Sequence, residues 1–178
     1  MERAAILLAN TVFAVRGRAG DAIRDAAVLE GWLAAHAGEL PAAPPTIDGV
    51  ALRRLRDATR ELLAALAEER APAGDALAVI NRASRSGPTS PLIEWGAESP
   101  TLGLVPGAAD GSEQFLACFA RSAIELATGR HARDVLACRG PRCVQFVLRD
   151  QPRRAFCSEA CSARARSARY YRRNRPAA

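Results

Sequence analysis

The chain contains no lysine, and all 25 of its basic residues are arginine. This bias is weak evidence of function, because a high-GC genome would produce it as well. Histidine is scarce, with two copies, His36 and His131, and neither belongs to an arrangement with Ser, Asp or Cys that would suggest nucleophilic catalysis. Phosphate-binding glycine loops and paired carboxylate motifs are also missing. The sequence therefore does not predict an enzyme.

Long apolar runs are missing too, since none approaches the ~20 residues that a membrane span needs. The segment closest to a secretion signal is residues 4–15. It is interrupted by Asn10 and Thr11, follows Glu2, and lacks a clean small-residue cleavage site. We therefore expect a buried first element, a cytoplasmic protein and no membrane partner. In the cytoplasm, cysteine pairs bind metal more often than they form disulfides.

The length of 178 residues allows one ordinary domain and a small appendage. A hydrophobic content of 49% is ample for a core. We expect a mainly α (α+β) protein, with a helical domain over residues 1–130 and a zinc finger over residues 131–178. Asp25, Asp48 and Ser112 are each predicted to cap a helix of the first domain.

The stretch from residue 84 to 111 differs from the helical segments, because it holds four prolines and five glycines. Within it, residues 92–95 and 101–105 are predicted to pair as a short β-hairpin across Ser99-Pro100.

Four cysteines lie in the last 41 residues, with the spacing Cys138-x4-Cys143-x13-Cys157-x3-Cys161. Two close pairs separated in this way are typical of a tetrahedral zinc site. Two disulfides and an iron–sulfur or redox site are the alternatives. A segment of this size cannot bury enough core to fold alone, so it needs a cross-link or a bound metal ion. In the cytoplasm that stabilising group is a metal ion. We predict one structural Zn²⁺ held by all four cysteines, with Cys118 as a core residue.

The layout of the finger follows from turn and cap signals. Gly140-Pro141 favours a turn between the first two cysteines. Residues 144–148 and 153–156 are predicted as the two strands of a hairpin. Ser158 is a natural N-cap, which places Cys161 in the first helical turn, where the helix dipole favours thiolate. Knuckle, hairpin and helix together make a treble-clef-like finger.

Positive charge is concentrated in this same segment. From residue 138 onward, eleven arginines face two acids, a formal charge of +9, whereas the preceding residues carry −3. This imbalance is too large for an ordinary solvated face, and guanidinium groups bind phosphate bidentately and can read guanine. We predict contact with double-stranded DNA, with RNA or an acidic protein as the alternative. The predicted contact residues are Arg149, Arg153, Arg154, Arg164, Arg166, Arg169, Arg172 and Arg173.

The sequence resembles the bacterial family that has an N-terminal ABATE domain and a C-terminal CGNR-type zinc finger. Residues 7–11 (LLANT) and 29–33 (LEGWL) are similar to its opening signatures, and residues 121–126 and 135–138 to its approach to the first zinc ligand. The resemblance implies a stress-responsive transcription regulator whose N-terminal domain senses a signal or oligomerises. The sequence reveals neither the signal nor the oligomeric state.

The finger also resembles that family at residues 156–158, an aromatic-Cys-Ser step, and at residues 161–164, which stand in the place of Cys-Gly-Asn-Arg. It departs from the pattern at Ser162 and Ala163, in a shorter gap before Cys161, and at Phe156, where Trp is common. If the family's Gly and Asn shape a specific contact, the sequence preference of this protein differs.

A ligand pocket in the N-terminal domain is a further hypothesis, with Asn10, Thr11, Trp32 and His36 as its candidate residues. The alternative is that Trp32 belongs to the core and that Asn10-Thr11 ends a structural element.

Overall fold

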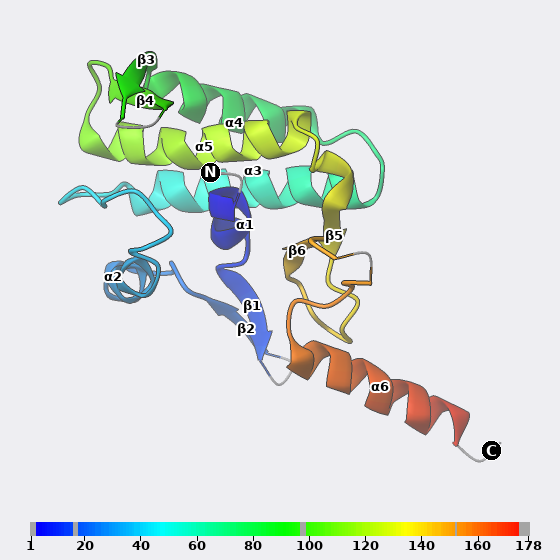
Figure 1. The fold of residues 1–178 in the computed structure, drawn as a ribbon. Coiled ribbons are helices and arrows are strands. Elements are labelled where there is room, and N and C mark those ends of the chain that lie inside the picture. Colours follow the sequence, from blue (N-terminus) through cyan, green and yellow to red (C-terminus); the bar gives the residue numbers. More distant parts are fainter. Residues whose placement is uncertain (1–2, 16–17, 97–98, 152, 175–178) are drawn as a thin grey trace.

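The computed structural model describes residues 3–15, 18–96, 99–151 and 153–174. Its centre is a bundle of three helices, α3 (Gly49–Ala67), α4 (Gly74–Ser86) and α5 (Gly111–Thr128), each of which packs against the other two (Figure 1). The short helix α1 (Arg3–Ala9) lies against α3 and α5. The core between them is built from fully buried side chains, among them Leu8, Leu52, Leu55, Leu63, Phe119 and Leu126.

Two of the three predicted helix caps are confirmed. The Asp25 carboxylate accepts a hydrogen bond from the first turn of α2 (Ala26–Ala35), and Asp48 does the same for α3. The prediction for Ser112 is wrong, because α5 begins at Gly111 and its N-cap is Asp110, two residues before Ser112. Ser112 therefore lies inside the first turn, and its hydroxyl accepts a hydrogen bond from the Asp48 N–H at 3.0 Å.

The predicted first element, residues 4–15, is divided between two structures. Helix α1 ends at Ala9, and β1 (Val12–Val15) then pairs antiparallel with β2 (Arg18–Asp21). The sequence analysis did not predict this hairpin. An ion pair of 2.7 Å between Asp21 and the buried Arg56 fastens it to α3.

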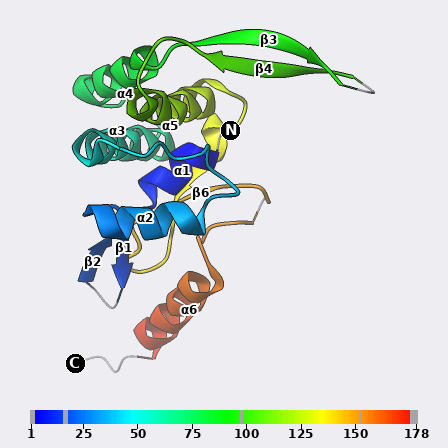
Figure 2. The ribbon, with the colours of Figure 1, turned by 90° about the vertical axis from the view of Figure 1, so that its left-hand side faces the viewer.

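The hairpin predicted in the proline- and glycine-rich stretch is confirmed. Strand β3 (Thr89–Trp95) pairs antiparallel with β4 (Pro100–Pro106), with Glu94 opposite Thr101, and both strands are longer than predicted. Figure 2 shows the two strands extending away from the ends of α4 and α5.

The C-terminal region contains β5 (Val135–Ala137), β6 (Phe146–Leu148) and α6 (Glu159–Arg173), with a short 3-10 turn, η1 (Ala132–Asp134), before them. The prediction that residues 153–156 form the return strand is wrong. The partner of β6 is β5, which lies before the first cysteine. This pairing buries Val135 and Phe146 in the main core, whereas residues 153–156 include no buried side chain, and Arg153 and Arg154 are exposed.

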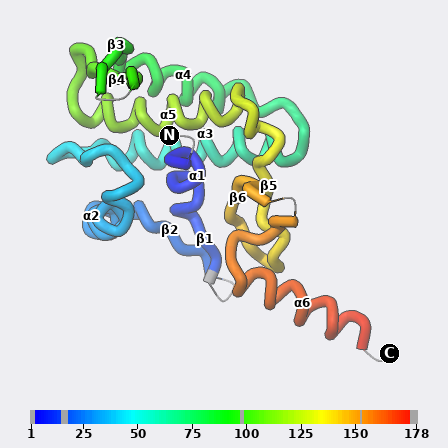
Figure 3. The backbone as a smooth tube through the Cα atoms, viewed as in Figure 1, coloured from blue at the N-terminus to red at the C-terminus, as the bar shows by residue number. Residues whose placement is uncertain are grey.

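The smooth trace in Figure 3 shows β5 below the end of α3, β6 next to β5, and α6 projecting beyond them. Only Cys161 and Ala165 are buried among the 15 residues of α6, all of which the structure describes. The predicted fold class is confirmed: a largely helical protein with small hairpins and a C-terminal cysteine cluster. In the described residues, no helix has both the length and the apolar character needed to cross a membrane.

Candidate metal centre and nucleic-acid interface

The four cysteines of the C-terminal region converge on one point. The sulfur atoms of Cys138, Cys143, Cys157 and Cys161 all lie within 4.8 Å of one another. Two sulfur pairs are closer, with 3.7 Å between Cys143 and Cys157 and 3.3 Å between Cys157 and Cys161. A tetrahedral ion with metal–sulfur bonds of about 2.3 Å has its sulfurs about 3.8 Å apart. The four residues are therefore close enough to hold a metal ion.

Each cysteine is positioned by a different piece of backbone. Cys138 follows β5, and its N–H donates to the Gln145 carbonyl at 2.8 Å. Cys143 closes the turn between the two strands through a 3.0 Å bond to the Gly140 carbonyl. Cys157 and Cys161 lie on either side of the α6 N-cap, where the predicted cap Ser158 accepts from the Cys161 N–H. Two of the cysteines thus come from the turn between β5 and β6, one from the residue before the cap of α6, and one from the first turn of α6.

The turn at Gly140 approaches the helix so closely that a side chain would not fit. A Cβ atom there would lie 2.9 Å from the Cys161 Cβ and 3.1 Å from its sulfur. The backbone also directs donors at Cys138, whose sulfur accepts from the N–H groups of Gly140 at 3.4 Å and Cys157 at 3.3 Å. These two donors hold the Cys138 sulfur in its place in the cluster.

The pKa values of the cysteines differ although their sulfurs are neighbours. Burial raises the pKa of the Cys143 thiol, and burial together with the adjacent sulfurs raises that of Cys157. At Cys161 burial opposes ionisation, but hydrogen bonds from Cys157 and Ser158 outweigh it and lower the pKa to about 7. One thiolate thus forms near neutral pH, and a bound cation would favour ionisation of the others.

Arginines surround the metal centre and line a series of adjoining cavities. One cavity is bounded by Arg139, Arg149, Arg153 and Arg154, and a second by Arg139, Arg169 and Arg172. A third, along α6, shares Arg169 and Arg172 with the second. We call this continuous region the basic surface; it comprises Arg139, Arg149, Arg153, Arg154, Arg166, Arg169, Arg172 and Arg173.

The structure brings together seven of the eight arginines that the sequence predicted as contacts. The eighth, Arg164, is turned toward the metal centre, and its Nη2 lies 2.9 Å from the Cys161 sulfur. Arg139 was missed by the sequence analysis, although it connects two of the cavities. Its position between the two cysteines of the first pair was the sequence feature that could have identified it. The buried Nε of Arg149 has no hydrogen-bond partner in the described part of the chain.

The four candidate pocket residues have structural contacts. The Asn10 side chain bonds to the backbone of Phe146, and the buried Thr11 hydroxyl donates to the Leu8 carbonyl at 2.8 Å. Trp32 is buried, and its ring centroid lies 5.1 Å from that of His36. The structure thus brings Trp32 and His36 together, and Asn10-Thr11 ends α1.

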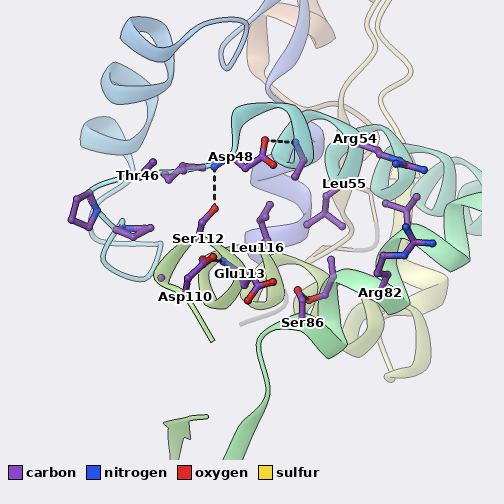
Figure 4. Close-up of a pocket in the computed structure, with 17 residues that line it drawn as sticks. Thr46, Asp48, Arg54, Leu55, Arg82, Ser86, Asp110, Ser112, Glu113 and Leu116 are labelled. Atoms are coloured by element: carbon purple, nitrogen blue, oxygen red, sulfur yellow. Dashed lines mark hydrogen bonds between the residues drawn. The ribbon is translucent and has the colours of Figure 1, made fainter. Parts of the chain in front are cut away.

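A cavity of about 860 Å³ lies elsewhere, between α3, α4 and the start of α5. Figure 4 shows carboxylates and guanidinium groups around an apolar floor that includes Leu55 and Leu116. Asp48, Asp110 and Glu113 supply the acidic groups, and Arg54 and Arg82 the basic ones. None of the four predicted pocket residues is among those that line this cavity.

The fold and the site define a class: a largely helical protein with a C-terminal cluster of four cysteines that could hold a metal ion. The sequence model of the ABATE family, described as "Putative stress-induced transcription regulator", matches residues 2–130. The chain therefore belongs to the ABATE family, which confirms the resemblance seen in its motifs. The family's description is that of a regulator, not of an enzyme. No curated protein matches the chain.

Proposed function

We propose that this protein is a zinc-dependent, DNA-binding transcription regulator of the cytoplasm, with a helical domain at residues 1–130 and a zinc finger at residues 131–178. The observation that carries the proposal is the continuous basic surface around the four-cysteine cluster. The metal would fix the finger, and the arginines would bind the phosphate backbone.

Zinc is favoured by the chemistry of the donor set. Four thiolates in a tetrahedral arrangement are a typical structural zinc site, since all positions are filled by the protein and none is left for water. The site lies where β5, β6 and α6 meet, and α6 has two buried residues, Cys161 and Ala165. Metal binding would therefore supply much of the free energy that holds α6 in place.

Duplex DNA is favoured over RNA by the shape of α6. The helix projects from the body and carries five arginines, with Glu159 as its one acid. A single helix fits the major groove of B-DNA, whereas the major groove of A-form RNA is too deep and narrow. Repulsion between the arginines weakens the free helix and is relieved by phosphates. RNA or an acidic protein surface is the second partner class.

Fluorescence anisotropy with the zinc-loaded full chain tests the proposal. The ligands are random-sequence duplex DNA, structured RNA and single-stranded DNA, each measured over a range of salt concentrations. The test variant combines Arg139→Gln, Arg169→Gln and Arg172→Gln. The control combines Arg24→Gln, Arg54→Gln and Arg85→Gln, which removes the same charge from the helical domain.

We expect the test variant to lose about 3 from the logarithmic salt slope on duplex DNA, about 0.9 for each lost phosphate contact. The control should keep the wild-type slope. An equal loss of salt slope in both variants would show that the protein attracts DNA only through its net charge. Binding to none of the three nucleic acids would indicate a protein-interaction module instead.

Signal sensing by the helical domain is a second candidate function, favoured by the 860 Å³ cavity between α3, α4 and α5. Its acidic and basic groups surround an apolar floor, which suits a zwitterionic or polar metabolite. A thermal-shift screen of metabolites tests this role. A true ligand should raise the melting temperature of the wild type and not that of Leu55→Phe, which would narrow the cavity.

A further inference from the structure

The β3–β4 hairpin has one face that is apolar over its three outer residue pairs. Residues opposite each other on paired strands share a face, and every second residue of a strand returns to it. Ile93 pairs with Leu102, and the neighbouring pairs two positions away on either side are also apolar. All of these residues are exposed. We call this the hairpin face; it consists of Pro91, Ile93, Trp95, Pro100, Leu102 and Leu104.

The opposite face of the hairpin is mixed, with Ser90, Glu94 and Thr101 beside Leu92 and Val105, and it is partly covered by its own side chains. Gly103 is buried there, because a Cβ at this position would lie 2.6 Å from Leu92 and 2.7 Å from the Glu94 carboxylate. The exposure of the hairpin face is much larger. Ile93 and Trp95 are each 79% exposed and Leu102 is 74% exposed.

The hairpin is held firmly at its base. The Gln114 side chain on α5 donates to the Pro88 carbonyl at 3.1 Å and to the Gly107 carbonyl at 3.2 Å. Gly107 in turn donates to the Pro88 carbonyl at 2.7 Å, which closes the two strand ends. Beyond this base the strands extend away from the helices. The body therefore presents the hairpin face in a fixed direction, and a two-stranded sheet of this kind gains stability from a second layer.

Association through the strand edges is disfavoured. Pro91 in β3 and Pro100 and Pro106 in β4 lack the N–H group that an added strand would require. The face, in contrast, can stack on a second sheet at the usual spacing of about 10 Å.

The area of the face approaches what a dimer needs. At their observed exposures, Ile93, Trp95, Leu102 and Leu104 leave on the order of 500 Å² uncovered, and the two prolines add to it. A stable interface buries about 800 Å² on each partner. The face carries no charge that would select an acidic or basic partner, and a second copy offers the same uncharged surface in a symmetric contact.

We infer that the hairpin face is the contact surface of a homodimer, formed when the apolar faces of two β3–β4 hairpins stack on each other. This inference is independent of the DNA-binding proposal, because the hairpin face shares no residue with the basic surface.

Sedimentation velocity with the zinc-loaded full chain, from low to high micromolar concentration, tests the inference. The test variant is Ile93→Thr with Leu102→Thr, which keeps strand-forming residues on the face. The control is Val50→Thr with Leu77→Thr, since these exposed aliphatic side chains lie on helices, with Val50 70% exposed. Equal melting temperatures and metal contents establish that both variants fold.

The wild type and the control should form dimers at the higher concentrations, whereas the test variant should have a dissociation constant raised about a hundredfold or more. Tryptophan quenching gives a second readout, because Trp95 is exposed and Trp32 is buried. Dimerisation should protect Trp95 from acrylamide. A wild type that stays monomeric throughout, or a dimer that the test variant leaves unchanged, would overturn the inference. Binding of monomeric wild type to neutral lipid vesicles would do so as well.

Discussion

Asn10 and Phe146, 136 residues apart in the sequence, exchange two hydrogen bonds. The Asn10 Nδ2 donates to the Phe146 carbonyl at 2.9 Å, and its Oδ1 accepts from the Phe146 N–H at 2.8 Å. The asparagine amide thus pairs with the backbone of β6 as another strand would. Gln145 adds a bond of 2.6 Å to the Val12 carbonyl. The end of α1 and the cysteine-bearing hairpin are joined by these contacts.

Replacing Asn10 with Asp should loosen this junction. The substitution turns a donor into an acceptor that faces the Phe146 carbonyl, so we expect a loss of about 1–3 kcal/mol in the free energy of unfolding. Chemical denaturation measures the loss, and hydrogen exchange should show faster exchange of the Phe146 amide. Asn81→Asp, on the exposed side of α4, is the matched control. Unchanged exchange at Phe146 would contradict the role given to Asn10.

Loss of a metal ligand should affect the C-terminal region first. Cys143→Ser is expected to lower zinc content well below one ion per chain and to remove the far-UV signal of α6, whereas α3, α4 and α5 should still unfold cooperatively. The control is Cys118→Ser, because Cys118 lies on α5, outside the cluster. Elemental analysis and circular dichroism measure both effects. A normal melt with full zinc content in Cys143→Ser would contradict the ligand set.

Arg164 and Arg172 should differ in what they support. The Arg164 guanidinium contacts the Cys161 sulfur, whereas Arg172 lines the basic surface. We expect Arg164→Gln to weaken zinc retention about 10–100-fold in a chelator competition, as loss of a hydrogen bond to a ligand does elsewhere. Arg172→Gln should retain zinc normally and bind DNA more weakly. If the two variants behaved alike, the distinction drawn from the contacts would fail.

The connection between α3 and α4 should be sensitive to acid. Hydrogen bonds from Arg70 and from the Ala73 N–H lower the pKa of Glu61 below its usual value of 4.5. A carboxyl group whose pKa is lowered by folding stabilises the protein above that usual value, and the contribution is lost as pH falls through the lowered pKa.

The difference in melting temperature between wild type and Glu61→Gln should therefore be largest near pH 7 and should shrink below about pH 4.5. Because the Glu61 side chain is partly exposed to solvent, at 33%, we expect a small difference that salt reduces further. Glu30→Gln, on the exposed side of α2, serves as the control. A difference that stays constant down to acidic pH would show that this ion pair does not contribute to stability.

Local signals in the sequence predicted much of the fold. The caps at Asp25, Asp48 and Ser158 were identified correctly because an N-cap depends on its own side chain and the next three residues. The β3–β4 hairpin was found for a similar reason, since prolines and glycines delimit it. The cap at Ser112 failed because Asp110, two residues earlier, is an equally good cap. Local sequence signals alone do not distinguish between two candidate N-caps that lie two residues apart.

Long-range contacts were not visible in the sequence. Strand β6 pairs with β5 because Val135 and Phe146 then enter the main core, and that gain depends on where α3 lies. The spacing of the cysteines predicted a common centre, since ligand geometry limits the loop between them. It did not reveal that Asn10 holds the hairpin in place or that Arg164 turns toward a sulfur. Both facts depend on packing between distant segments.

Helix α6 is anchored at one end only, so a small rotation at that end displaces its other end by several ångströms. Its 15 residues span about 22 Å, and the anchoring side chains Cys161 and Ala165 lie in its first two turns. A rotation of about 10° at the cysteine cluster would carry the far end about 4 Å, comparable to the separation of stacked base pairs. An ion of different radius would therefore change the positions of Arg172 and Arg173 without contacting them. The affinity for DNA should then vary with the metal supplied.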